Sequence, residues 1–113
     1  MDSSILTSIK KLLGIAEEDT SFDQDIIMHI NTVFAILAQL GVGPANGFSI
    51  EDDGAIWGDY LGNATNLELV KSYIYMKVRS MFDPPTSSSL ADAMSKNISE
   101  LEWRINTTVD PKN

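Results

Sequence analysis

The sequence contains no cysteine among its 113 residues. This absence excludes disulfide-stapled folds, thiolate metal sites and cysteine nucleophiles, and it indicates a chain that does not depend on an oxidising compartment. Histidine is nearly absent as well, because His29 is the single one in the chain. A zinc site or a histidine-dependent catalytic centre therefore has few side chains from which to form.

Basic residues and long apolar runs are also scarce. Eight Lys and Arg stand against sixteen Asp and Glu, which gives a formal net charge of -8. Binding to nucleic acid by phosphate neutralisation needs a basic patch, so the composition argues against a DNA-reading protein. The longest apolar run, Val33 to Ala38, is too short to cross a bilayer. Asp2 stands where a signal peptide carries basic residues, so we expect a soluble protein made in a cytoplasm.

The residues that are present favour one helical domain. An apolar content of 43% is enough for a core in a chain of this length. Apolar residues recur at helical spacing in four segments. They run from Ile5 to Leu13, from near Phe22 to Leu40, from Leu67 to Asp83, and from the serines at 87–89 to Ile105. The pattern predicts a mainly α fold, a four-helix bundle-like domain over residues 1–106 with a flexible tail at 107–113.

Polar residues with capping chemistry predict where these helices begin. The expected caps are Asp2 or Ser3 for the first helix, Ser21 with Gln24 for the second, Thr65 with Glu68 for the third, and Ser87, Ser88 or Ser89 for the fourth, where Ser89 with Asp92 resembles a capping box. Gly14 and Gly41 are expected to end the first two helices.

A long connection, residues 41–64, separates the second and third predicted helices. Phe48-Ser49-Ile50 alternates in polarity and can form a short strand or one arm of a β-hairpin. Residues 56–61 can form one or two helical turns, and we expect Trp57 to pack this loop onto the helices. An ordered loop of this length in a small domain usually carries a function.

Asp83-Pro84-Pro85 is predicted to be a stiff elbow between the last two helices. The residue before a proline is driven out of the helical region, and proline cannot donate the next backbone hydrogen bond. The elbow therefore fixes where one helix ends and the angle at which the next begins.

Two acidic patterns resemble metal sites but are incomplete. Asp25 lies four residues before His29, on the same side of a helix, yet zinc needs three or four protein ligands. We interpret His29 as a polar-face histidine beside an acid. The run from Glu51 to Gly54 resembles part of a calcium loop, but Tyr60 stands at the twelfth position, where a bidentate Glu is required. We interpret this run as a turn with an acidic tip.

The sequence shows no arrangement suited to catalysis. There is no Gly-x-Ser-x-Gly motif, no P-loop lysine and no dinucleotide-binding fingerprint. We therefore predict no catalytic residue, no cofactor and no metal. The predicted apolar stripe of the last helix consists of Leu90, Met94, Ile98, Leu101 and Ile105. Trp103 lies off this stripe, with Arg104 beside it. Either Trp103 packs against a loop or it anchors an interface, since Trp and Arg are enriched at binding hot spots.

The whole pattern resembles the head–tail connector, or adaptor, proteins of tailed bacteriophages, in the connector family of siphophages. The Phe-Asp-Pro-Pro elbow and the Glu-Trp-Arg-Ile-Asn ending are its most specific parts. The matching residues are Leu13 to Ile15, Phe22 to Ile27, His29 to Asn31, Leu40 to Gly43, Trp57, Lys71 to Arg79, Phe82 to Ser88, and Leu101 to Asn106.

The resemblance implies a structural virion protein rather than an enzyme. Family members are expected to form a ring, twelvefold in the virion, that binds the portal and joins the capsid to a stopper or tail-completion protein. Genomic DNA would pass through the ring without specific binding, no membrane would be involved, and assembly would take place in the host cytoplasm.

The resemblance also suggests regions of contact. The candidate portal-binding residues are Trp103, Arg104, Ile105 and Asn106. The candidate loop residues facing a neighbour, the stopper or the lumen are Phe48, Glu51, Asp52, Asp53 and Trp57. Two alternatives remain at this point: a small helical protein-binding or regulatory module of a bacterial complex, and a hydrolase or metal protein that uses His29 and Asp25.

Overall fold

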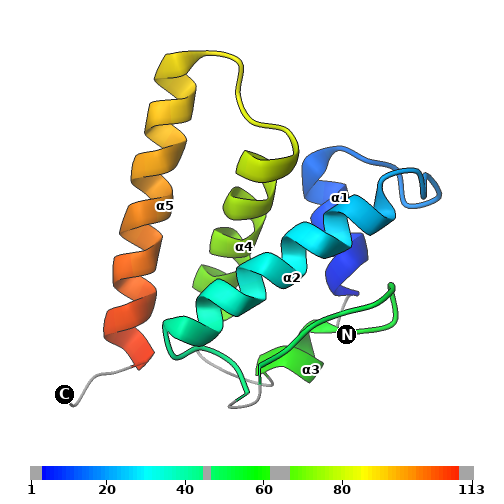
Figure 1. The fold of residues 1–113 in the computed structure, drawn as a ribbon, viewed down its shortest axis with the longest axis horizontal. Coiled ribbons are helices and arrows are strands. Elements are labelled where there is room, and N and C mark those ends of the chain that lie inside the picture. The colour runs from blue at the N-terminus through cyan, green and yellow to red at the C-terminus, as the bar shows by residue number, and fades with distance from the viewer. Residues whose placement is uncertain (1–3, 45–46, 62–66, 110–113) are drawn as a thin grey trace.

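Helices make up most of the chain in the computed structural model, which describes residues 4–44, 47–61 and 67–109. The helices are α1 (Ile5–Leu13), α2 (Asp23–Gln39), α3 (Trp57–Leu61), α4 (Leu67–Phe82) and α5 (Ser88–Val109). The predicted mainly α fold is confirmed, and the short α3 lies where residues 56–61 were expected to be able to form helical turns. In Figure 1, α4 lies between α5 and the pair formed by α1 and α2.

The core is built around α4. Four of its side chains are buried, and α1 and α2 pack against α4 and against each other. The apolar stripe of each helix faces this centre, as the helical period requires. The buried apolar and aromatic residues of the three helices are Ile5, Leu6 and Ile9 of α1, Ile26, Ile27, Ile30, Val33, Phe34 and Leu37 of α2, and Val70, Tyr73, Ile74 and Val78 of α4.

Helix α5 is attached at the edge of this core. It packs on α4, and among its described side chains only Ile98 and Ile105 are buried. Leu90 was expected on the core stripe but is 62% exposed. The stripe prediction is wrong at Leu90 because a helix that contacts one neighbour buries a narrow arc, and Leu90 lies at the margin of that arc.

Two helix starts differ from the predicted caps, and the start of α5 agrees with them. Ser4, rather than Asp2 or Ser3, caps α1, and its Oγ accepts a hydrogen bond from the Thr7 N–H at 3.2 Å. Ser87, one of the three serines expected to cap the last helix, caps α5 by accepting a hydrogen bond from the Leu90 N–H. Ser21 does not cap α2; its N–H and Oγ–H donate to Asp19 Oδ1 instead. These two hydrogen bonds lower the pKa of Asp19. Ser21 therefore takes part in a local turn with Asp19 and does not cap α2.

The helix ends agree more closely with the sequence. Gly14 ends α1 in the left-handed conformation with a φ of 82°. Helix α4 ends at Phe82, just before the elbow. Thr65 of the predicted third capping box lies outside the described residues. Helix α5 runs to Val109, so the first three residues of the predicted tail, 107–109, are helical, and residues 110–113 lie outside the described part.

The long loop is held to α2 by a side-chain clamp. The Ile50 N–H donates to Asn31 Oδ1 at 2.8 Å, and Asn31 Nδ2 donates to the Ile50 carbonyl at 3.0 Å. The expected strand at Phe48-Ser49-Ile50 does not form within the described residues, where the β pairing is a single bridge between Ser4 and Ile56. The amide of Asn31 takes the place that a second strand would have.

Aromatic side chains fix the rest of the loop. Phe34 of α2 lies 5.2 Å from Phe48 and 4.5 Å from Tyr60, measured between ring centroids. Trp57 is buried, and its Nε1–H donates to Ser8 Oγ at 3.2 Å. The expectation that Trp57 packs the loop onto the helices is confirmed. Gly43 is required beside this cluster, because a Cβ there would lie 2.7 Å from a ring carbon of Tyr60.

A largely buried ion pair joins α1 to the start of α2. Lys10 of α1 is 3% exposed, and its Nζ lies 2.8 Å from Asp23 Oδ1 at the start of α2. The same Nζ donates to the Glu17 carbonyl at 2.9 Å. Lys10 thus joins α1, the connection after it and the first turn of α2 through one cation.

Candidate interaction surfaces

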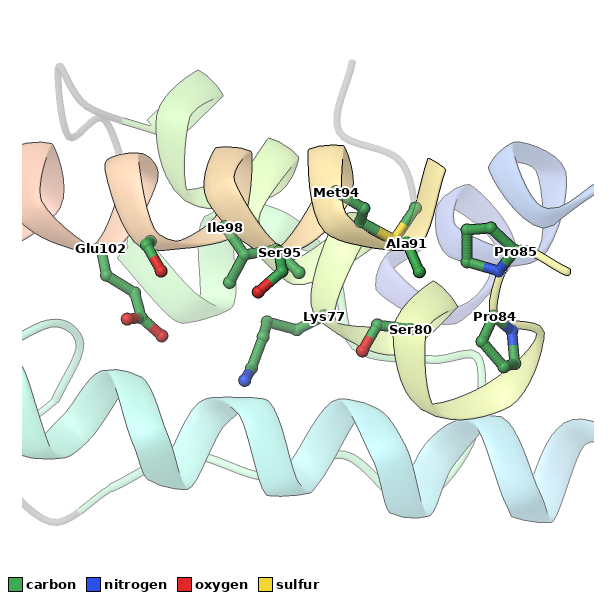
Figure 2. Close-up of a pocket in the computed structure, with 10 residues that line it drawn as sticks. Lys77, Ser80, Pro84, Pro85, Ala91, Met94, Ser95, Ile98 and Glu102 are labelled. Atoms are coloured by element: carbon green, nitrogen blue, oxygen red, sulfur yellow. The ribbon is translucent and has the colours of Figure 1, made fainter. Parts of the chain in front are cut away.

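The elbow and the two helices that it joins border a groove. It has a volume of about 410 Å³ and receives side chains from α4, from the two prolines and from one side of α5. In Figure 2, Lys77 of α4 and Glu102 of α5 point into the space between α5 and α2. Its apolar lining includes Met94 and Ile98. The predicted elbow therefore forms the end wall of a surface groove.

A second hollow runs along the other side of α5. Two adjoining parts of about 270 and 310 Å³ share Met76 and Asn97. At 100° per residue, Leu90, Asn97 and Arg104 fall on one side of the line through Ile98 and Ile105, and Ser95 and Glu102 fall on the other. Helix α5 therefore lies on α4 as a single row of contacts with an open groove on each flank.

One polar contact locks α5 to α4 in addition to the buried isoleucines. The Tyr73 hydroxyl donates to Glu102 Oε2 at 2.7 Å. Burial, together with this hydrogen bond and the charge of Glu102, raises the pKa of Tyr73 above its ordinary value of 10.0.

Burial also raises the pKa of Tyr60, whose hydroxyl has no partner among the described residues. Because both pKa values are raised by folding, the stability that these protonated groups contribute is lost as pH rises above about 10.

The two buried tyrosines are expected to respond oppositely to loss of the hydroxyl. Tyr73→Phe should lower the free energy of unfolding by about 1–2 kcal/mol, because Glu102 loses its donor. Tyr60→Phe should leave stability unchanged or raise it, since it removes a buried hydroxyl that lacks a partner. Equilibrium urea melts of both variants check the pair, and equal losses would contradict the assignment of partners.

The four candidate portal-binding residues do not share one face. Trp103 is 68% exposed, and Arg104 and Asn106 are also exposed. Ile105 is 0% exposed and belongs to the core. Four consecutive residues of a helix spread over about 300°, so they cannot form one contact surface. Arg104 forms an ion pair with Glu100 at 2.7 Å on the outer side of α5.

The candidate loop residues also differ in exposure, since some lie on the surface and others pack inside. Glu51, Asp52 and Asp53 are exposed at the tip, where the Gly54 N–H donates to Asp52 Oδ1 at 2.8 Å. This arrangement confirms the interpretation of the run as a turn with an acidic tip. Phe48 is half-buried in the aromatic cluster. Trp57 is 2% exposed and lies under Lys71 of α4, whose Nζ is 5.2 Å from the ring centroid.

His29 is engaged in packing. Its ring meets Phe82 edge-on with the ring centroids 6.4 Å apart, and Phe82 also contacts Phe22. Within the described part of the chain, no three His, Asp or Glu side chains gather to hold a metal ion.

Among the residues that the structure describes, no helix is both long enough and apolar enough to span a membrane.

Sequence reasoning did not foresee the grooves beside α5. The sequence feature that could have indicated them is the pair Met76 and Met94. Both lie at helical spacing from core residues, yet both are half-buried. Long, flexible methionine side chains at the margin of an apolar stripe are typical of adaptable contact surfaces.

Comparison with models of known protein families gave a match to this chain. The family model described as phage connector protein matches residues 5–112, which covers all the helices. No curated protein and no solved structure matched the chain. Connectors of this kind are structural components of the phage particle that contact other virion proteins. With nearly its whole length matched, the chain belongs to the phage connector protein family.

Proposed function

We propose that this protein is a head–tail connector that forms a ring beneath the portal at one capsid vertex. The ring, expected to be twelvefold, joins the capsid to the stopper or tail-completion protein and lets the genome pass through its centre. Assembly would take place in the cytoplasm of the bacterial host. Support comes from the family match over residues 5–112.

The observation that carries the proposal is the separation of exposed surfaces around one core. The outer face of α5 bears Trp103, and the acidic tip projects from the long loop on α1 and α2. A ring subunit needs different faces for its neighbours and for the components above and below it. The small core around α4 holds these faces in fixed relation.

We assign portal docking to the outer face of α5. Trp103 is the most exposed large apolar side chain among the described residues, and its solvent exposure has no structural benefit for the isolated chain. Trp is also the residue type most enriched at binding hot spots. Arg104 and Asn106 flank it, whereas Ile105 supports the helix from below. Residues 107–113 would extend the same contact.

We assign the acidic tip to the stopper or to the lumen of the ring. Glu51, Asp52 and Asp53 place three carboxylates on an ordered turn. Carboxylates facing the channel would repel the phosphates of DNA and let the genome slide without adhering.

The test is the variant Trp103→Ala. Binding to the purified portal should weaken by at least about 30-fold, the loss expected for one hot-spot aromatic. The unfolding temperature should not change, because Trp103 is exposed. Sedimentation of portal with the connector, and a thermal melt of the connector alone, measure the two quantities.

Lys96→Ala is the matched control, since Lys96 is exposed on the same outer side of α5. It should retain portal binding. Unchanged binding by Trp103→Ala would remove the docking assignment, and a lowered melting temperature would mean that Trp103 supports the fold.

A further inference from the structure

The outward face of α2 has the pattern of a helix that packs against another helix. Its exposed residues include Asp25, Met28, Thr32, Ala35 and Gln39, at intervals of three and four residues. This spacing places them in one seam opposite the core face. Met28 is an apolar member of this seam, and its side chain is 58% exposed.

The seam is also nearly free of charge. Asp25 is its one charged member, in a chain with sixteen acids and eight basic residues. Depletion of charged residues marks the centre of protein interfaces. A second copy of a chain with a net charge of -8 also meets the least repulsion where acids are absent.

The seam is bordered by a hollow that can receive a partner side chain. Ala35 and Ala38 line it from α2, and Phe48 and Ser49 line it from the long loop. The hollow measures about 520 Å³. Small residues on the helix therefore allow close approach, and the loop forms a side wall.

The groove on the Asn97 side of α5 complements this seam. Its apolar side chains are Met76, Leu90, Met94 and Leu101. Arg79 lines it toward the elbow, and Arg104, with its partner Glu100, lines it toward the other end. An apolar floor with Arg79 at the elbow end suits a nearly uncharged helix that begins with an acid. Met76 and Met94 can adapt to the facing side chains.

We propose that the seam of α2 from one copy lies in the α4–α5 groove of the next copy. The inference rests on the proposed ring and names the two surfaces that build it. The seam lies on α2, whereas the groove lies between α4 and α5. A contact between two different faces repeats head-to-tail and closes into a ring when the rotation permits. Portal docking centred on Trp103 leaves the seam and the apolar floor of the groove free, although Arg104 borders both the docking face and the groove.

The absence of cysteine makes a direct test available. The double variant Ala35→Cys/Asn97→Cys carries one thiol on the seam and one in the groove. Assembled on purified portal and oxidised, it should give a ladder of disulfide-linked multimers on a non-reducing gel, and reductant should collapse the ladder. Each single variant can link two copies at most, so it should stop at dimers.

The matched control is Ala35→Cys/Lys96→Cys, which moves the second thiol by one residue to the outer side of α5. It should form no ladder. Equal ladders from both double variants, or no ladder from Ala35→Cys/Asn97→Cys bound to portal, would overturn the proposed contact while leaving the connector function standing. Failure of the unmodified chain to assemble on portal would instead overturn the connector function and the contact with it.

A second variant tests the groove without thiols. Leu90→Glu places a charge on a side chain that is 62% exposed, so the isolated fold should melt unchanged. The concentration needed for half-maximal assembly should rise by at least about tenfold, as expected for burying an unpaired charge at an interface. Unchanged assembly would contradict the placement of the neighbour in this groove.

Discussion

Replacing Ile105 with alanine is expected to lower the free energy of unfolding by about 2–5 kcal/mol, the cost of a large-to-small change at a packed site. Ile105 is 0% exposed, and it is one of two buried apolar side chains among the described residues of α5. Its loss therefore removes much of the attachment of α5 to α4. Denaturant melts followed by circular dichroism measure the change.

Leu101→Ala provides the internal comparison. Leu101 lies on the same stripe but is half-buried and lines a groove, so its truncation should cost roughly 1 kcal/mol. Equal losses for the two variants would show that α5 is rotated on α4 relative to the structure. A loss at Leu101 alone would place Ile105 on the surface.

Replacing Lys10 with methionine should lower the free energy of unfolding by about 3 kcal/mol, toward the lower end for one broken buried ion pair. The apolar stem is retained, but the Asp23 carboxylate and the Glu17 carbonyl lose their shared cation. The lower figure reflects Asp23, whose side chain is 22% exposed and can be hydrated in part. Thermal and urea unfolding measure the change.

Lys11→Met is the control for this variant, because Lys11 is the exposed neighbour in the same turn of α1. Its effect should stay within about 0.5 kcal/mol, as for most surface substitutions. Similar effects at both lysines would mean that the Lys10–Asp23 contact contributes little to stability.

The helices could be predicted from the sequence because their signals are local. The period of the apolar residues indicated α1, α2, α4 and α5, and Gly14 and the elbow marked helix ends that the structure confirms. The burial of α5 could not be predicted in detail. Helical spacing defines an arc, but the number of neighbours decides how much of that arc is covered. Leu90 and Ile105 share one stripe, and one is exposed while the other is buried.

The surfaces were less accessible to sequence reasoning, since they depend on contacts between distant segments. The clamp between Asn31 and Ile50 joins residues nineteen positions apart, and no local pattern announces it. Trp57 shows the same limit. It was expected both to pack the loop and to face a partner, and the hydrogen bond to Ser8 and the burial of its ring show the packing role.

The clamp between Asn31 and Ile50 affects how copies of this chain can associate without forming fibrils. An extended backbone with free N–H and C=O groups is a template on which further copies add without limit, as in fibrils. In this chain the most strand-like segment ends at Ile50, whose two backbone groups are already occupied by one amide side chain. In the proposed ring, these occupied backbone groups would favour assembly by matched side-chain shapes, which can stop at a fixed number of subunits, over open-ended backbone pairing.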